Sequence, residues 1–238
     1  MQIKITLVSD SEINLPIAYR HAQQSLIYNV LRACPEYSEA LHNHGTSMNT
    51  TGFKLFTFSS LEGSYTKVGK RLIFDGRVSF EIRCHDAHMM QLLLAGFRSG
   101  TKINLLNNTL TVESCYMENK IIFENAVKIR MVSPITILSN TSDGHTVYYS
   151  PEDEIFYERV VANAKRKWCA VHDERDFDLS FCAANDNFNK LVTLFKNTYV
   201  NAWYGNFILK GNPKVIDFLY NVGLGNKTSQ GFGMFEIL

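Results

Sequence analysis

The chain has 238 residues, is 45% hydrophobic and carries a formal net charge of +1 at pH 7. This size and apolar content suffice for one large core or for two smaller domains. The near-neutral charge excludes a protein that binds nucleic acid through bulk positive charge, so any RNA would have to be held by local basic patches.

The first half predicts strands and helices in alternation. Ile3, Ile5 and Leu7 alternate with other residues as in a strand, and Leu93 and Phe97 recur at helical spacing. The expected elements are a strand at 1–8, a helix from Pro16 to about residue 33, a strand at 53–59, two strands at 71–83 forming a hairpin at Asp75-Gly76, a helix at 85–97 and a strand region at 102–115.

The second half repeats this order. The expected elements are a strand at 126–132, a helix at 151–171, a strand at 177–183, a long or broken strand region at 190–209, a helix at 213–222 and a strand at 232–238. We therefore expect an α+β protein of two tandem ferredoxin-like (RRM-like) βαββαβ domains, residues 1–120 and 121–238. This fold hosts many functions, although RRM modules use its sheet to bind RNA.

The cysteines are odd in number and widely spaced, and no two of them form a CxxC pair. This pattern predicts neither a zinc site nor a disulfide framework, and we expect no metal and no cofactor. No apolar run approaches the length of a membrane span, and no signal peptide is evident. We expect a cytoplasmic protein without membrane contact.

Residues 223–233 read Gly-Leu-Gly-Asn-Lys-Thr-Ser-Gln-Gly-Phe-Gly. Glycines can adopt positive φ and let the backbone approach a ligand, and the donors between them suit a phosphate backbone. The order of helix, glycines and strand fits neither a Walker A loop nor a dinucleotide fingerprint. A plain connection without ligand is the alternative. The candidate RNA-binding residues here are Gly223, Gly225, Lys227, Ser229, Gly231 and Gly233.

The amino-acid sequence of this loop, from Val222 to Met234, closely resembles the C-terminal signature of the Cas6 family of CRISPR repeat endoribonucleases. Leu-Pro-Ile-Ala-Tyr at 15–19, Ser-Leu-Ile-Tyr-Asn at 25–29, Leu41-His42 and Phe-Lys-Leu-Phe-Thr-Phe-Ser at 53–59 follow the order of the same family. The resemblance implies the tandem ferredoxin-like fold. It also implies a metal-independent endoribonuclease that binds precursor CRISPR RNA and cuts it within its repeats.

By the same resemblance, Tyr28, His42 and Lys54 match the catalytic set of the family. Tyr28 lies opposite the apolar face of its predicted helix, and His44 is the reserve candidate for His42. The residue types suit RNA cleavage, in which the 2′-OH attacks the neighbouring phosphate. Histidine can transfer protons near neutral pH, lysine can stabilise the phosphorane, and tyrosine can position the 2′-OH.

Further basic residues are candidates for RNA binding. Lys128 and Arg130 alternate on a predicted strand and would share one face. The run 165–167 precedes Trp168 on a helix, where it forms either a solvated face or a phosphate contact.

Two other functions fit the sequence. One is a catalytically inactive protein that binds CRISPR repeat RNA, and the other is a structural subunit of a CRISPR effector complex. Other effector-complex subunits are therefore candidate partners. Both a monomer and a homodimer are compatible with the sequence.

Overall fold

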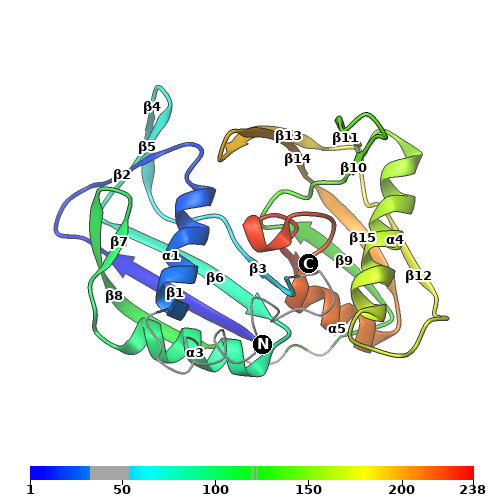
Figure 1. Ribbon diagram of the computed structural model, residues 1–238, viewed down its shortest axis with the longest axis horizontal. Helices are drawn as coiled ribbons and strands as arrows, with labels where there is room; N and C mark the ends of the chain where they lie inside the picture. The colour runs from blue at the N-terminus through cyan, green and yellow to red at the C-terminus, as the bar shows by residue number, and fades with distance from the viewer. Residues whose placement is uncertain (33–53, 119–120, 122) are drawn as a thin grey trace.

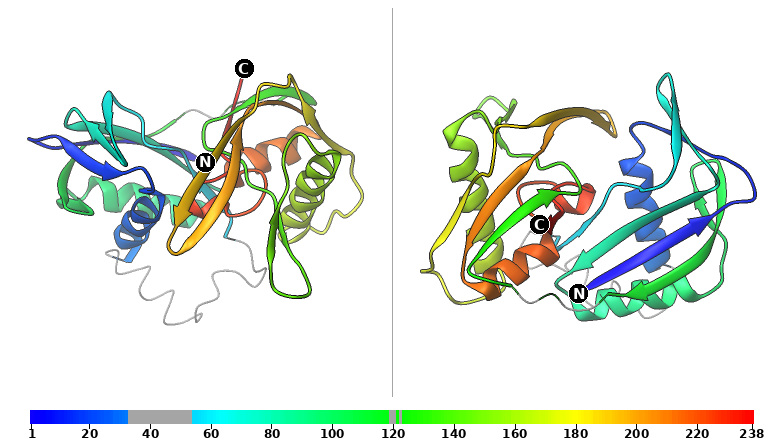
Figure 2. Two further views of the ribbon diagram at one scale, coloured as in Figure 1. Left: turned by 90° about the horizontal axis from the view of Figure 1, so that it is seen from above. Right: turned by 180° about the vertical axis from the view of Figure 1, so that it is seen from behind.

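Figure 1 shows a computed structural model of the chain, in which residues 1–32, 54–118, 121 and 123–238 are described. The two halves of the chain lie side by side, and each builds an antiparallel sheet with helices on one face (Figures 1 and 2). Within the described residues, no helix combines the length and apolar character needed to cross a membrane.

The first half forms a ferredoxin-like unit. Its elements are, in chain order, β1 (Gln2–Val8), β2 (Ile13–Pro16), α1 (Arg20–Arg32), β3 (Phe56–Phe58), β4 (Tyr65–Val68), β5 (Arg71–Phe74), β6 (Arg77–Cys84), α3 (Ala87–Arg98), β7 (Ile103–Leu105) and β8 (Asn108–Met117). The main sheet has the order β3-β6-β1-β8-β7. Strands β1, β3, β6 and β8 with helices α1 and α3 thus make the predicted βαββαβ unit.

The second half repeats the unit. Its elements are β9 (Ala126–Met131), β10 (Leu138–Asn140), β11 (Thr146–Tyr148), α4 (Glu154–Cys169), β12 (Leu179–Ala183), β13 (Asn189–Phe195), β14 (Thr198–Tyr204), β15 (Asn206–Gly211), α5 (Pro213–Val222), the 3₁₀ helix η1 (Thr228–Gln230) and β16 (Phe235–Ile237). The sheet order β12-β15-β9-β16 matches that of the first half, and the hairpins β10–β11 and β13–β14 are insertions. The prediction of two tandem ferredoxin-like domains is confirmed.

Two local predictions are wrong. Pro16 does not open the first helix but ends β2, an edge strand that pairs with β5, and α1 begins at Arg20. An edge strand tolerates proline because one of its sides needs no N–H donor. Asp75-Gly76 does separate two strands, but β5 pairs with β2 and β4, whereas β6 pairs with β1 and β3. The turn therefore joins two sheets and does not close a hairpin.

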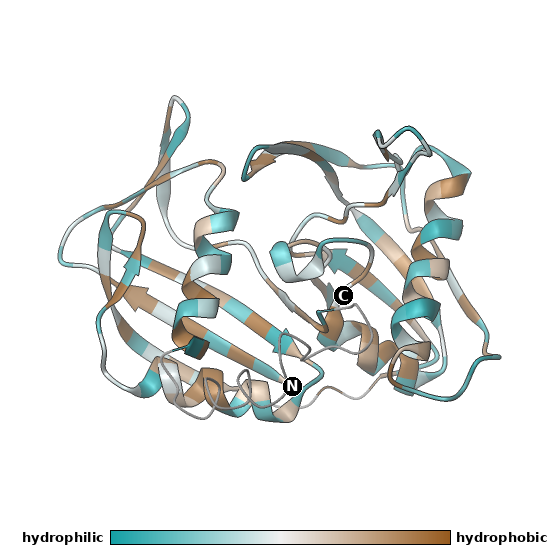
Figure 3. Ribbon diagram, in the orientation of Figure 1, coloured by the Kyte–Doolittle hydropathy of each residue, from teal (hydrophilic) through white to brown (hydrophobic). Residues whose placement is uncertain are grey.

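Each half has its own apolar core, and buried polar side chains join the two. Apolar and polar residues alternate along β1 and β6 in Figure 3, as expected for strands with one covered face. Arg83 of β6 is buried, lies 3.6 Å from the ring centroid of Tyr220 in α5, and donates to the Phe235 carbonyl in β16. Contacts of this kind fix the second half against the first.

Candidate active site

Tyr28 and Lys54 lie together near the C-terminal end of α1. The ammonium nitrogen Nζ of Lys54 is 5.1 Å from the ring centroid of Tyr28, and this ring meets that of Phe56 edge to face. Phe56 opens β3, which pairs with β6 and so fixes where Lys54 stands. Tyr28 is half-buried and packs against the core of the first half. The structure thus places two of the three predicted catalytic residues side by side.

His42 lies outside the described residues, and so does the reserve candidate His44. The segment that contains them leaves α1 at Arg32 and returns to the described chain at Lys54. The two residues that flank this segment are therefore Arg32, which lies one helical turn after Tyr28 in α1, and Lys54 itself.

The glycine loop, residues 223–233, connects α5 to β16 and is largely buried. As predicted, its glycines adopt positive φ, between 74° and 85°: Gly223, Gly225, Gly231 and Gly233. A Cβ on Gly233 would lie 1.9 Å from the carbonyl oxygen of Leu224, and a Cβ on Gly225 would lie 2.6 Å from that of Thr136. Close packing of the backbone inside the protein therefore requires these glycines.

Most of the glycine N–H groups are used within the protein. Those of Gly223, Gly231 and Gly233 donate to carbonyl oxygens at 2.8–3.0 Å. These three N–H groups are therefore already bonded to acceptors inside the protein. RNA binding by the glycine loop stays a prediction. The side chains of Lys227 and Ser229 remain as the candidate donors of the loop.

Helix α1 holds both the glycine loop and Tyr28. Arg20 donates through Nε to the carbonyl of Gly231 at 3.3 Å, and Gln24 donates through Nε2 to the carbonyl of Ser229 at 2.6 Å. Arg20, Gln24 and Tyr28 are spaced four residues apart, which places them along one face of the helix. The helix face that carries Tyr28 thus also docks the loop of the second half.

Lys167 of α4 also holds the glycine loop, so the loop is bonded to a helix of the second half as well as to α1 of the first. It is buried, and its Nζ donates to the carbonyl oxygens of Gly223 and Gly225 at 2.9 and 2.8 Å. Burial, with a smaller effect of the neighbouring Arg166, lowers the pKa of Lys167 to about 7. Two acceptors match the two hydrogens of a neutral amine. The sequence did not show this role, because a basic run on a helix favours a solvated face.

The lowered pKa of Lys167 predicts a pH-dependent stability. Between about pH 7 and about pH 10 the unfolded chain binds more protons at this site than the folded protein. The contribution of Lys167 to the free energy of unfolding should therefore rise with pH in this window. Urea unfolding of wild type and Lys167→Met at about pH 6 and about pH 9 measures it. The wild type should gain stability relative to Lys167→Met at the higher pH, whereas a Lys165→Met control should show no such change. A constant gap would contradict the prediction.

A cavity of about 320 Å³ lies between α1, the glycine loop and the tip of the β13–β14 hairpin. Its basic side chains come from three separate segments, and none of the described residues that line it is Asp or Glu. They are Gln24, Lys54, Phe195, Lys196, Thr198, Val200, Lys227, Ser229 and Gln230. Burial lowers the pKa of Lys227. A concave site with three lysines and no described carboxylate suits an anionic ligand.

Of the three lysines that line the cavity, Lys196 is the one that the sequence did not suggest. It stands in the turn between β13 and β14, in a stretch that we predicted only as a long or broken strand. The dipeptide Lys196-Asn197 between two apolar runs was the available turn signal.

Lys128 and Arg130 are exposed on one face of β9, as predicted, but they do not line this cavity. Arg130 forms an ion pair with Glu236 of β16. RNA binding by these two residues stays a prediction.

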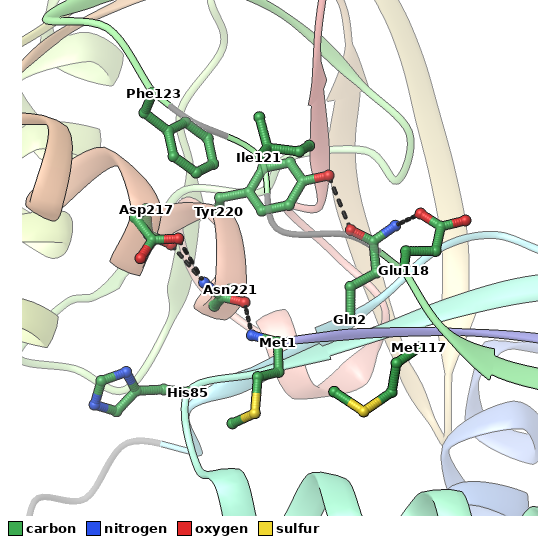
Figure 4. A pocket seen from close by; sticks show the side chains of 10 residues that line it. All are labelled: Met1, Gln2, His85, Met117, Glu118, Ile121, Phe123, Asp217, Tyr220 and Asn221. Carbon is green, nitrogen blue, oxygen red and sulfur yellow. Dashed lines mark hydrogen bonds between the residues drawn. The ribbon is translucent and has the colours of Figure 1, made fainter.

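A second cavity, of about 330 Å³, lies beside the N-terminus and is shown in Figure 4. The Met1 amine donates to Asn221, while Gln2 accepts from the Tyr220 hydroxyl and donates to Glu118. These bonds join β1 and the end of β8 to α5. Asp217 and Glu118 line this cavity, so it suits a polyanion less than the lysine-lined one does.

The fold and the cavity thus define a protein of two ferredoxin-like domains with a basic site where the domains meet. Two family models match the chain: "CRISPR-associated protein Cas6, N-terminal" over residues 14–115 and "CRISPR associated protein Cas6, C-terminal" over residues 117–237. The chain belongs to the Cas6 family.

Individual relatives agree with this membership. The chain is 28% identical to "CRISPR-associated endoribonuclease Cas6 1" of Methanocaldococcus jannaschii, covering 98% of this chain and 91% of the relative. It is 24% identical to "CRISPR-associated endoribonuclease Cas6" of Pyrococcus furiosus, covering 100% of this chain and 90% of the relative. A solved structure, "CRISPR associated protein Cas6", superposes with a TM-score of 0.81 at 26% identity and covers 100% of this chain and 99% of that one.

Proposed function

We propose that the protein is a metal-independent endoribonuclease that cleaves precursor CRISPR RNA within its repeats, in the cytoplasm. The observation that carries the proposal is the contact between Tyr28 and Lys54, with Lys54 lining a cavity that Lys196 and Lys227 also line. This arrangement can hold a phosphate backbone at a phenol and an ammonium group. The names of the two curated relatives support the same activity.

In the proposed reaction, the 2′-OH of the nucleotide before the cut attacks the adjacent phosphorus. The bond to the 5′-oxygen of the next nucleotide breaks, which leaves a 2′,3′-cyclic phosphate and a 5′-OH. His42 transfers a proton, either from the 2′-OH or to the leaving oxygen. Lys54 stabilises the charge on the non-bridging oxygens, and Tyr28 positions the 2′-OH. Water carries out the other proton transfer, so no net proton is gained or lost, and no step requires a metal ion.

The test is incubation with the repeat RNA of the neighbouring CRISPR array in excess EDTA, with the product ends mapped. We expect one cut in each repeat, and 5′-OH and 2′,3′-cyclic phosphate ends. A repeat that lacks the 2′-OH of the nucleotide before the cut should stay intact, because the nucleophile is missing. A repeat with the same change one nucleotide further on is the matched control and should be cut.

Each failure points to a different conclusion. Binding of the repeat without cleavage would favour an inactive RNA-binding relative or a structural subunit. Activity that EDTA abolishes, or cleavage of the first deoxy substrate, would overturn the proposed mechanism.

A further inference from the structure

The tip of the β13–β14 hairpin is anchored between the two halves of the protein. Phe195 and Thr198 are paired at its end, which leaves Lys196 and Asn197 in the turn. Phe195 is buried in a small cluster with Phe232 of the glycine loop, and its ring meets that of His21 in α1 edge to face with centroids 5.4 Å apart. The position of Lys196 is therefore fixed by contacts to both halves.

The backbone of Lys196 is in an unfavourable conformation for a lysine. Its φ is 56°, and Lys227 across the cavity has the same value. Among the described non-glycine residues, only Leu106 also has a positive φ. The left-handed region costs about 1 kcal/mol or more for most side chains, and asparagine or glycine would adopt it more readily. Strained backbone of this kind concentrates at functional sites.

Both of these lysines line the cavity that also contains Lys54. The three ammonium groups come from the hairpin tip, the glycine loop and the residue before β3. No described residue that lines the cavity is Asp or Glu, so these cations have no carboxylate partner within the lining. A chain of phosphates passing between the hairpin and the loop would supply the missing negative charge.

We propose that Lys196 is a phosphate-binding residue of the RNA site, and that the RNA backbone passes between the hairpin tip and the glycine loop to reach Lys54. The inference rests on the proposed function and assigns the hairpin of the second half a direct part in it. Lys196 binds a phosphate away from the reacting one, so it contributes to RNA affinity more than to the chemical step.

The test uses variants that keep the turn. Lys196→Asn removes the charge and replaces it with a residue that tolerates positive φ, and Lys196→Arg keeps the charge. Lys102→Asn, an exposed lysine before β7, is the control with the same change in net charge. Repeat RNA with the 2′-deoxy nucleotide at the mapped cut is the probe, and affinity is measured over a range of salt. If the wild type leaves RNA intact, the unmodified repeat is the probe.

We expect Lys196→Asn to bind about tenfold more weakly, the scale of one charge-assisted hydrogen bond. The slope of log affinity against log salt should fall by about 0.7, the value for one phosphate contact of single-stranded RNA. Lys196→Arg should restore both, and Lys102→Asn should resemble the wild type. The single-turnover rate of cleavage of bound RNA should change less than the affinity.

Unchanged affinity and salt slope in Lys196→Asn would overturn the inference while leaving the proposed function intact. Equal losses in Lys196→Asn and Lys102→Asn would also overturn it, because they would reflect net charge alone. A wild type that binds RNA through Lys196 but does not cut it would overturn the proposed function only. A wild type that does not bind repeat RNA would overturn both.

Discussion

Replacement of His42 by alanine is expected to slow cleavage of bound repeat RNA by ~10²-fold or more, the usual effect of removing a positioned proton-transfer group. Histidine, whose unperturbed pKa is about 6.5, can accept the proton of the 2′-OH or protonate the leaving oxygen at neutral pH. Alanine can do neither. RNA affinity should persist, because the lysines that line the cavity are unchanged. Single-turnover rates at saturating protein, together with RNA affinities, separate the two effects.

The matched control is His44→Ala, which removes a histidine two residues away in the same segment. We expect it to cleave like the wild type. Full activity in His42→Ala with a loss in His44→Ala would transfer the catalytic role to His44. Full activity in both variants would mean that neither histidine transfers the proton, and the proposed reaction would need another acid or base.

The order of strands and helices could be predicted from the sequence because each ferredoxin-like unit repeats one periodic pattern. Sheet membership could not be predicted in the same way. Asp75-Gly76 has the composition of a hairpin turn, and that composition depends only on the local backbone. Which strands β5 and β6 pair with depends on the rest of the chain, and here they pair with different partners. Pro16 was misassigned for the same reason, since its place in an edge strand depends on β5.

The candidate site was predicted in part. Tyr28 and Lys54, two members of the catalytic set that the family resemblance implies, lie close together, and their catalytic roles stay a prediction. The positive φ of the glycines was also predicted, but a glycine pattern does not reveal what approaches the backbone. At Gly225 and Gly233, the atoms that approach the backbone belong to the protein itself. Lys167 and Lys196 could not be selected from sequence, because burial of one and the docking of the other depend on contacts between distant segments.

Replacement of Gly233 by alanine is expected to destabilise the protein by about 3 kcal/mol or more. The left-handed backbone at φ 74° costs a non-glycine residue about 1–2 kcal/mol. The new Cβ would also lie 1.9 Å from the carbonyl oxygen of Leu224, which belongs to the backbone and cannot rotate away. Overpacking of this kind adds about 1–3 kcal/mol. The glycine loop closes here, since the Leu224 N–H donates to the Gly233 carbonyl at 2.8 Å.

Gly100→Ala is the matched control, because Gly100 has φ 75° and a Cβ there would meet nothing within 4 Å. Urea unfolding of both variants separates the cost of the backbone conformation, which they share, from the cost of the clash, which only Gly233→Ala has. Equal losses of stability would show that the backbone around Leu224 shifts to make room for the new Cβ at little cost. If Gly233→Ala loses more, RNA affinity should fall with it even where the variant stays folded, because Lys227 and Ser229 belong to the same loop as Gly233. Gly100→Ala should keep the RNA affinity of the wild type.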